Sequence, residues 1–212
     1  MHATAIRWAA TLLDLPGVVA EAANRGDAAT TYRLSDSGTA AGYLKVASGG
    51  LAGERDRLAW LGRRVAAPGV LGFAESDGRE WLLTAPLPGS DLSQPVHTAQ
   101  PHRLVRLLAS ALSRLHSLDA AECPFGPAHA GAVVIHGDAC LPNFVFDETD
   151  LTGYLDVGEL RRGSPEVDLA AAVWSLEHNL GPGFGAELLR RYGWPQTDEA
   201  TVERLRRSYE LS

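Results

Sequence analysis

This 212-residue chain has very little lysine, and its cationic side chains are outnumbered by carboxylates. Lys45 is its only lysine, and the formal net charge is −7 at pH 7. A nucleic-acid-binding surface needs basic residues facing the phosphates, so we expect no nucleic-acid partner. An acidic surface would instead favour a cationic small molecule, and a solvated acidic surface without a functional role is an equally open interpretation.

Cysteine and long apolar segments are also scarce. Cys123 and Cys140 are too few for the disulfide framework of a small secreted protein, so we interpret both as reduced thiols. The apolar segment Trp8–Leu13 is short, is followed by Asp14 and Pro16, and has no basic leader before it. These features argue against a signal peptide or a membrane span. We therefore expect a cytoplasmic protein with no membrane partner.

What remains is typical of a globular protein that buries a core, with 45% hydrophobic and 21% charged residues. Strand patterns come first and helical patterns follow, with a stiff Pro- and Gly-containing connector at residues 85–90 between them. This order predicts an α+β protein of two lobes, residues 1–85 and residues 86–212. The expected strands are 30–35, 41–46, 71–75, 80–84, 133–135, 143–147 and 151–156, and the expected helices are 51–65, 104–118, 167–180, 186–192 and 197–211.

The single lysine lies inside one of the predicted strands, and a carboxylate follows it on the next helix. Glu54 falls on the apolar stripe of helix 51–65, and a buried carboxylate needs a partner. Lys45, just upstream, is the available cation. Two simpler interpretations stay open: an exposed strand lysine, and a glutamate favoured by the helix dipole.

One irregular segment carries a recognisable chemistry. His136-Gly137-Asp138-Ala139-Cys140-Leu141-Pro142-Asn143 places a carboxylate and an amide on one loop, and a strand pair returns Asp156 beside them. Phosphoryl transfer from ATP needs one carboxylate to orient a hydroxyl and accept its proton, and further oxygen ligands to hold Mg²⁺ on the phosphates. The segment therefore favours a kinase.

The whole set resembles the aminoglycoside 3′-phosphotransferases, which have a protein-kinase-like fold. The likeness rests on residues 134–143 and 153–158, and extends to residues 54–61, 81–83, 88–92, 114–119 and 123–125. The resemblance implies a nucleotide-binding N-terminal lobe, with an antiparallel sheet and one helix, and a mainly helical C-terminal lobe for catalysis and substrate binding.

The resemblance also implies roles for individual residues, with ATP and Mg²⁺ as cofactors. Asp138 would be the catalytic base, and Asp168 the structural aspartate behind its loop, although a plain helix N-terminal carboxylate remains an alternative for Asp168. The nucleotide-binding residues would be Lys45, Glu54 and His136, of which Glu54 fixes Lys45 and His136 braces the loop. The Mg²⁺ ligands would be Asn143 and Asp156.

Three departures from the family concern the acceptor. Gly126–Ala132 replaces a longer helical insert that carries acidic residues, Glu159 stands where an arginine is common, and the closing acidic pair becomes Tyr209-Glu210. We assign Glu159 and Glu210 to the substrate site, because a polycation is recognised through carboxylates.

The leading hypothesis is an ATP-dependent kinase of a hydroxyl on an aminoglycoside or similar aminocyclitol, of the antibiotic-resistance type. A kinase of another small-molecule hydroxyl is the first alternative. A nucleotide-binding module without efficient turnover is the second.

Overall fold

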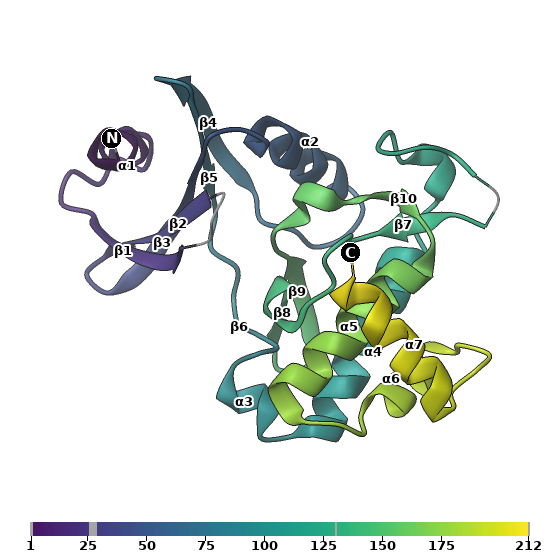
Figure 1. Cartoon of the computed structure of the whole chain (residues 1–212). Coiled ribbons are helices and arrows are strands. Elements are labelled where there is room, and N and C mark those ends of the chain that lie inside the picture. Colours follow the sequence, from purple (N-terminus) through teal and green to yellow (C-terminus); the bar gives the residue numbers. More distant parts are fainter. Residues whose placement is uncertain (1, 26–28, 130, 212) are drawn as a thin grey trace. The chain divides into compact units, whose positions relative to one another are not determined.

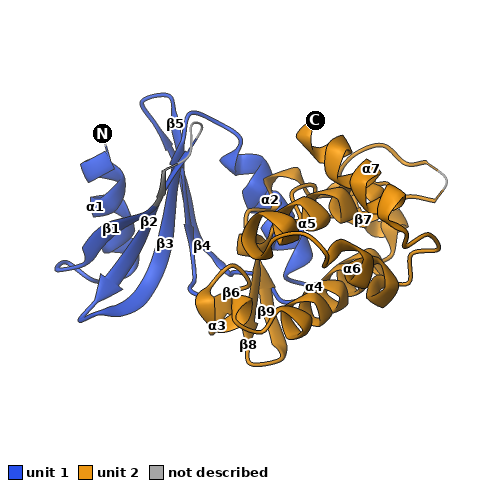
Figure 2. Cartoon of the chain, turned by 60° about the horizontal axis from the view of Figure 1, so that its bottom comes forward, with its two compact units in different colours: residues 1–87 blue, residues 88–212 orange. Residues whose placement is uncertain are grey.

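The structure is a computed structural model that describes residues 2–25, 29–129 and 131–211. The chain divides into two compact units, residues 1–87 and residues 88–212 (Figure 2). In the described part of the chain, every helix is too short or too polar to cross a bilayer.

The first unit contains a five-stranded antiparallel sheet, in the order β1-β2-β3-β5-β4. Its two tight hairpins turn at Ser37-Gly38 and Asp77-Gly78, where both central residues have positive φ, as the twist of a hairpin favours. The four strands expected here are confirmed, and β1 was missed. The strands are β1 Val19–Arg25, β2 Ala29–Asp36, β3 Thr39–Ala47, β4 Val70–Ser76 and β5 Arg79–Thr84.

Two helices, α1 (His2–Leu12) and α2 (Leu51–Leu61), cover opposite faces of this sheet (Figure 1). The expectation of one helix is therefore wrong, and α2 ends four residues earlier than expected. The sequence signal of α1 was weak because its two fully buried side chains, Ala5 and Ala9, are small. They pack with Leu44 and Val46 of β3 in one core cluster.

The second unit is mainly helical, as expected, and carries two small antiparallel sheets, β6-β8-β9 and β10-β7. The expected strand 133–135 is found unchanged, the other expected helices and strands are found with shifted ends, and the short elements α3, β6 and β10 were missed. The helices are α3 Pro95–Thr98, α4 Pro101–His116, α5 Pro165–Leu180, α6 Gly185–Tyr192 and α7 Glu199–Glu210. The strands are β6 Ser90–Asp91, β7 Val133–Ile135, β8 Phe144–Asp147, β9 Asp150–Tyr154 and β10 Arg161–Gly163.

Helix α4 supplies much of the core of this unit, because Leu104, Leu108, Leu112 and Leu115 repeat at helical spacing and are all fully buried. The phenol of Tyr154, at the end of β9, donates a hydrogen bond of 2.8 Å to the carbonyl of Ala111. Buried polar groups need such partners. This bond attaches the β8–β9 hairpin to α4.

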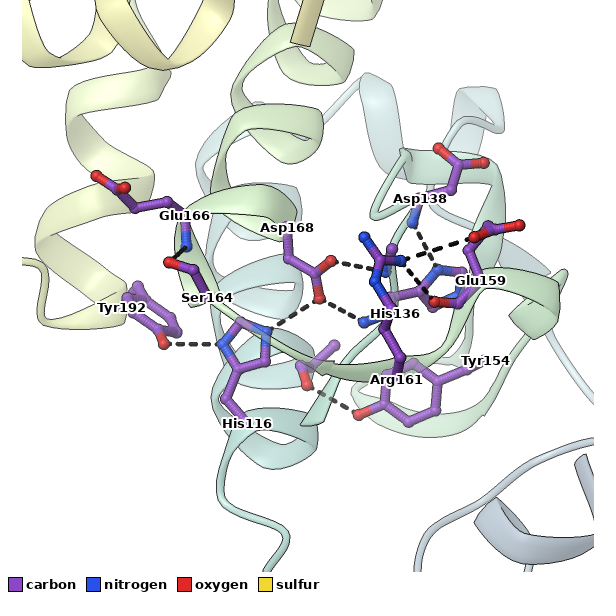
Figure 3. Close-up of polar contacts among 12 residues, drawn as sticks. His116, His136, Asp138, Tyr154, Glu159, Arg161, Ser164, Glu166, Asp168 and Tyr192 are labelled. Atoms are coloured by element: carbon purple, nitrogen blue, oxygen red, sulfur yellow. Dashed lines mark hydrogen bonds and ion pairs between the residues drawn. The ribbon is translucent and has the colours of Figure 1, made fainter. Parts of the chain in front are cut away.

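A buried carboxylate attaches the segment after β7 to two helices (Figure 3). Asp168 lies in the first turn of α5 and has no exposed surface. Its side chain accepts hydrogen bonds from the backbone N–H of His136 at 2.7 Å, the N–H of Gly137 at 2.9 Å and Nε2 of His116 at 3.0 Å. His116 is itself buried and contacts the Tyr192 hydroxyl through Nδ1 at 2.8 Å. Asp168 is therefore more than a helix N-terminal carboxylate.

Replacing Asp168 by alanine should cost about 3–5 kcal/mol of unfolding free energy, because it leaves buried donors without an acceptor. Glu166→Ala is the matched control, since this exposed carboxylate in the same helical turn contacts Arg204 at 3.1 Å and a surface pair of this kind is worth at most about 1 kcal/mol. Denaturant unfolding followed by circular dichroism measures both. Equal losses in the two variants would contradict the structural role of Asp168.

Candidate functional site

The segment between β7 and β8 brings Asp138 and Asn143 into direct contact. Nδ2 of Asn143 donates to the backbone carbonyl of Asp138 at 2.9 Å and to its carboxylate Oδ2 at 3.0 Å. A short 3₁₀ turn, Leu141–Asn143, makes this return possible, and its Pro142 suits the start of such a turn. The loop thus presents one carboxylate with a fixed orientation.

His136 supports this loop from inside. Its side chain is fully buried, Nε2 lies 2.9 Å from the carbonyl of Leu155, and the N–H of Asp138 donates to Nδ1 at 3.3 Å. Since a carbonyl only accepts, Nε2 carries the proton and Nδ1 is the acceptor. A side chain without exposed surface cannot contact a nucleotide, so the placement of His136 among the nucleotide-binding residues is corrected: it braces the loop.

Asp156 follows β9. A backbone hydrogen bond brings it near Asn143, since the N–H of the preceding residue, Leu155, donates to the Asn143 carbonyl at 2.9 Å. Its φ of 52° and ψ of 49° lie in the left-handed region, which a non-glycine residue rarely adopts. Residues in such conformations cluster at functional sites. Asp156 is exposed at this turn.

The oxygen atoms of this region suit a hard divalent cation. The Asn143 side chain donates a hydrogen bond from its amide nitrogen to Asp138. The amide oxygen on the opposite side of the group therefore points away from that carboxylate. In the described residues, no three His, Cys, Asp or Glu side chains gather to hold a metal ion by themselves. Mg²⁺ at a nucleotide needs fewer protein ligands, because waters and phosphate oxygens complete its coordination.

In the first unit, Lys45 and Glu54 form the pair that their positions suggested. The ammonium Nζ lies 2.8 Å from Glu54 Oε2, and the glutamate side chain is 8% exposed against 20% for the lysine. Leu44 and Val46 belong to the core cluster on the α1 side, so the alternation of β3 turns Lys45 toward α2. Glu80, which the sequence did not single out, accepts hydrogen bonds from the N–H groups of Leu51 and Ala52 at the start of α2.

Of the two predicted substrate carboxylates, Glu159 lies beside the Asp138 loop (Figure 3). Gly137 has a φ of 89°, and a Cβ there would lie 2.6 Å from the Cβ and carbonyl oxygen of Glu159. Only glycine allows this close approach. Arg161 donates to the Glu159 carbonyl at 2.9 Å and lies 3.7 Å from its carboxylate, which is 74% exposed.

The other predicted carboxylate, Glu210, lies at the end of α7 and contacts Arg206 at 2.5 Å. Its charge is therefore partly used within the helix. The neighbouring Tyr209, which the sequence did not single out, reaches the loop instead: its hydroxyl lies 3.4 Å from Asp138 Oδ1 and 3.3 Å from Cys140 Sγ. No local pattern could have identified this contact, because Tyr209 and Asp138 are 71 residues apart in the sequence.

The chain is similar in sequence to known proteins. An aminoglycoside 3′-phosphotransferase of Niallia circulans is 26% identical over 254 residues, which cover 95% of this chain and 96% of that protein. One of Streptomyces ribosidificus is 29% identical over 83% of this chain and 89% of its own length. The first alignment extends over more positions than this chain has residues, so that relative has internal segments that this chain lacks.

The fold is similar to that of solved structures as well. A crystal structure of an aminoglycoside-3′-phosphotransferase of type VIII superposes with a TM-score of 0.77 at 26% identity, covering 96% of each chain. The model of the phosphotransferase enzyme family (APH) matches residues 19–130 and 126–206. This chain therefore belongs to the phosphotransferase enzyme family and has its kinase-like fold.

Proposed function

We propose that this chain is an ATP-dependent phosphotransferase that moves the γ-phosphate of ATP to a hydroxyl of an aminoglycoside or a similar aminocyclitol. The observation that carries the proposal is the contact between Asn143 and the Asp138 carboxylate, in a loop held by the buried Asp168. Relatives of nearly full coverage that are aminoglycoside 3′-phosphotransferases support this acceptor class.

In this proposal Asp138 orients the acceptor hydroxyl and receives its proton as the oxygen attacks the γ-phosphorus and the bond to the β-phosphate oxygen breaks. Positioning supplies most of the catalysis, so the Asn143 contact that fixes the carboxylate matters as much as its basicity. Mg²⁺, held by Asn143 and Asp156, would neutralise charge on the phosphates. Lys45, fixed by Glu54, would contact the phosphates from the N-terminal lobe.

The acceptor side of the proposal has fewer carboxylates than the resemblance implies. The two segments that match the family model meet at residues 126–130, inside the stretch interpreted as a shortened insert. Glu159 is the exposed carboxylate beside the loop, and Glu210 forms an ion pair with Arg206. Each charge-assisted hydrogen bond that is lost would remove about 1.5–3 kcal/mol, or roughly tenfold or more in affinity.

The proposal also includes the location. The cytoplasm supplies ATP and keeps the free thiols of Cys123 and Cys140 reduced. The acidic net charge of −7 supports a cationic substrate rather than a nucleic acid.

Incubation with Mg²⁺-ATP and a panel of aminoglycosides should give products heavier by one phosphate, detected by mass spectrometry. We expect an acceptor KM above the usual range of about 1 μM–1 mM, because few carboxylates face the polycation. Binding measured by titration calorimetry should weaken as salt rises, since the contacts are partly exposed.

An uncharged sugar is the control and should neither bind nor be phosphorylated. Absence of product with every aminoglycoside, together with normal ATP binding, would contradict the proposed function. Tight binding that does not depend on salt would show instead that another part of the chain forms the acceptor pocket.

Asp138→Asn should lower kcat by a factor of about 10² to 10⁴ while nucleotide binding is retained, because it removes the base and keeps the shape. Asp147→Asn is the matched control: it removes an exposed carboxylate at the end of β8 and should leave kcat unchanged. Near wild-type turnover in Asp138→Asn would exclude Asp138 as the base.

A nucleotide analogue that acylates amines should label Lys45, the only ε-amine of the chain, and excess ATP should prevent the labelling. Peptide mass spectrometry locates the modification. Lys45→Arg should lower kcat/KM by about tenfold or more, because the guanidinium keeps the charge but changes the shape and donors. Labelling that is indifferent to ATP would mean that Lys45 is not at a phosphate site.

A further inference from the structure

The last turn of α7 reaches the loop of the proposed base through Tyr209. The Tyr209 hydroxyl lies 3.4 Å from Oδ1 of Asp138, the carboxylate oxygen that Asn143 does not contact. It also lies 3.3 Å from Sγ of Cys140 in the same loop. The carboxylate is thus approached at Oδ2 from its own loop and at Oδ1 from α7.

The ring of Tyr209 is held in place by aromatic neighbours on α5. Its centroid lies 5.1 Å from that of Trp174, with the planes tilted by 41°. Trp174 in turn stacks on His178, one helical turn further, with centroids 5.0 Å apart and planes at 10°. Aromatic contacts at these distances are favourable and restrict the ring. The position of the hydroxyl is therefore set by the face of α5.

The end of α7 is also fixed by ion pairs. Arg206 contacts Glu177 of α5 at 3.7 Å, and Glu203 and Glu210 of α7 at 2.8 and 2.5 Å. Single surface pairs contribute little, but several charges that share one guanidinium form a network. This network includes Arg206 and Glu210, which flank Tyr209 in the sequence, and connects the end of α7 to α5.

The Tyr209 phenol and the Cys140 thiol both carry a proton that can be donated. Burial raises the pKa of the Cys140 thiol to about 12, and burial and the neighbouring Cys140 raise the pKa of Tyr209 above its usual value. Both groups therefore keep their protons at neutral pH. The phenol of Tyr209 can therefore donate a hydrogen bond to Oδ1 of the Asp138 carboxylate, and either atom can be the donor in the contact between the phenol and the Cys140 thiol.

We propose that Tyr209 is a positioning residue of the phosphotransfer site, whose hydroxyl holds the Asp138 carboxylate in the orientation in which it meets the acceptor hydroxyl. The inference rests on the proposed function. It gives α7 a part in catalysis, through Tyr209, in addition to the predicted role of Glu210. The contact at 3.4 Å is long for a hydrogen bond between oxygens, and such contacts shorten when the substrate is bound.

Kinetics of Tyr209→Phe test the role. We expect kcat to fall by about tenfold, the scale for losing one hydrogen bond to a charged group, with unchanged KM for ATP. Calorimetric ATP-binding stoichiometry gives the folded fraction, so kcat can be expressed per binding-competent molecule. Tyr32→Phe is the matched control, since it removes a phenol that contacts His2 in the other unit, and kcat should not change.

The contact itself can be tested without an acceptor. With tyrosine labelled by ¹³C at Cζ, the Tyr209 signal is identified by its loss in Tyr209→Phe, and it should shift in Asp138→Asn but not in Asp147→Asn. An unmoved signal in Asp138→Asn would overturn the contact, and wild-type kcat in Tyr209→Phe would overturn the role. Absence of phosphorylated product from the wild-type chain would count against the proposed function instead, and the NMR result would still decide the contact.

Discussion

The buried carboxylate of Asp168 is the constraint on which the rest of the second unit depends. A charge without exposed surface is stable only with several donors, and Asp168 has three, two of them consecutive backbone N–H groups of the loop. Those two bonds fix the backbone at His136 and Gly137. The start of the loop is therefore held by α5, and contacts within the loop, such as that of Asn143 with Asp138, hold the rest.

From this point each contact depends on the previous one. The fixed backbone at His136 places its ring between the Asp138 N–H and the Leu155 carbonyl, which ties the loop to the turn before Asp156. The fixed backbone at Gly137 allows Glu159 to approach closely. The backbone anchor at Asp168 thus acts together with the Asn143–Asp138 contact to arrange the predicted base, which suits a reaction in which positioning supplies most of the rate.

The two sides of the reaction are built differently. In the proposed function, the residues for phosphate chemistry are the partly buried Lys45–Glu54 pair of the first unit and the Asn143–Asp138 contact of the second unit, each with short hydrogen bonds. For the acceptor, the exposed Glu159 and the ion-paired Glu210 are the predicted carboxylates. The alignment with the Niallia circulans relative covers 254 positions, more than the residues of this chain, so the chain lacks segments that the relative has. The residues proposed for the phosphates are held by contacts within each unit, whereas those proposed for the acceptor are exposed or lie on α7, where Tyr209 reaches Asp138.

The sequence by itself determined the features that depend on local patterns. Alternating strands, Asp-Gly and Ser-Gly turns and the apolar stripe of α4 predicted most elements, and the order of Lys45, Glu54, Asp138, Asn143 and Asp156 predicted the family. The pairing of Lys45 with Glu54 was also predictable, because a carboxylate on a buried helix stripe needs a nearby cation. Helix α1 escaped prediction, since its buried alanines give little hydrophobic contrast.

Only the tertiary structure decided which side chains act across long separations. From the sequence, His136 could be expected near a nucleotide. In the structure its side chain is fully buried, and both ring nitrogens form hydrogen bonds with the backbone. Asp168 had a plain alternative as a helix N-terminal carboxylate, and its three donors come from segments 31 to 52 residues away. Tyr209 had no signal at all, because its partners in the loop are about seventy residues distant and are met only where α7 packs on α5. Local patterns report the periodicity of burial, whereas hydrogen-bond partners at such distances depend on how helices pack, which no short segment encodes.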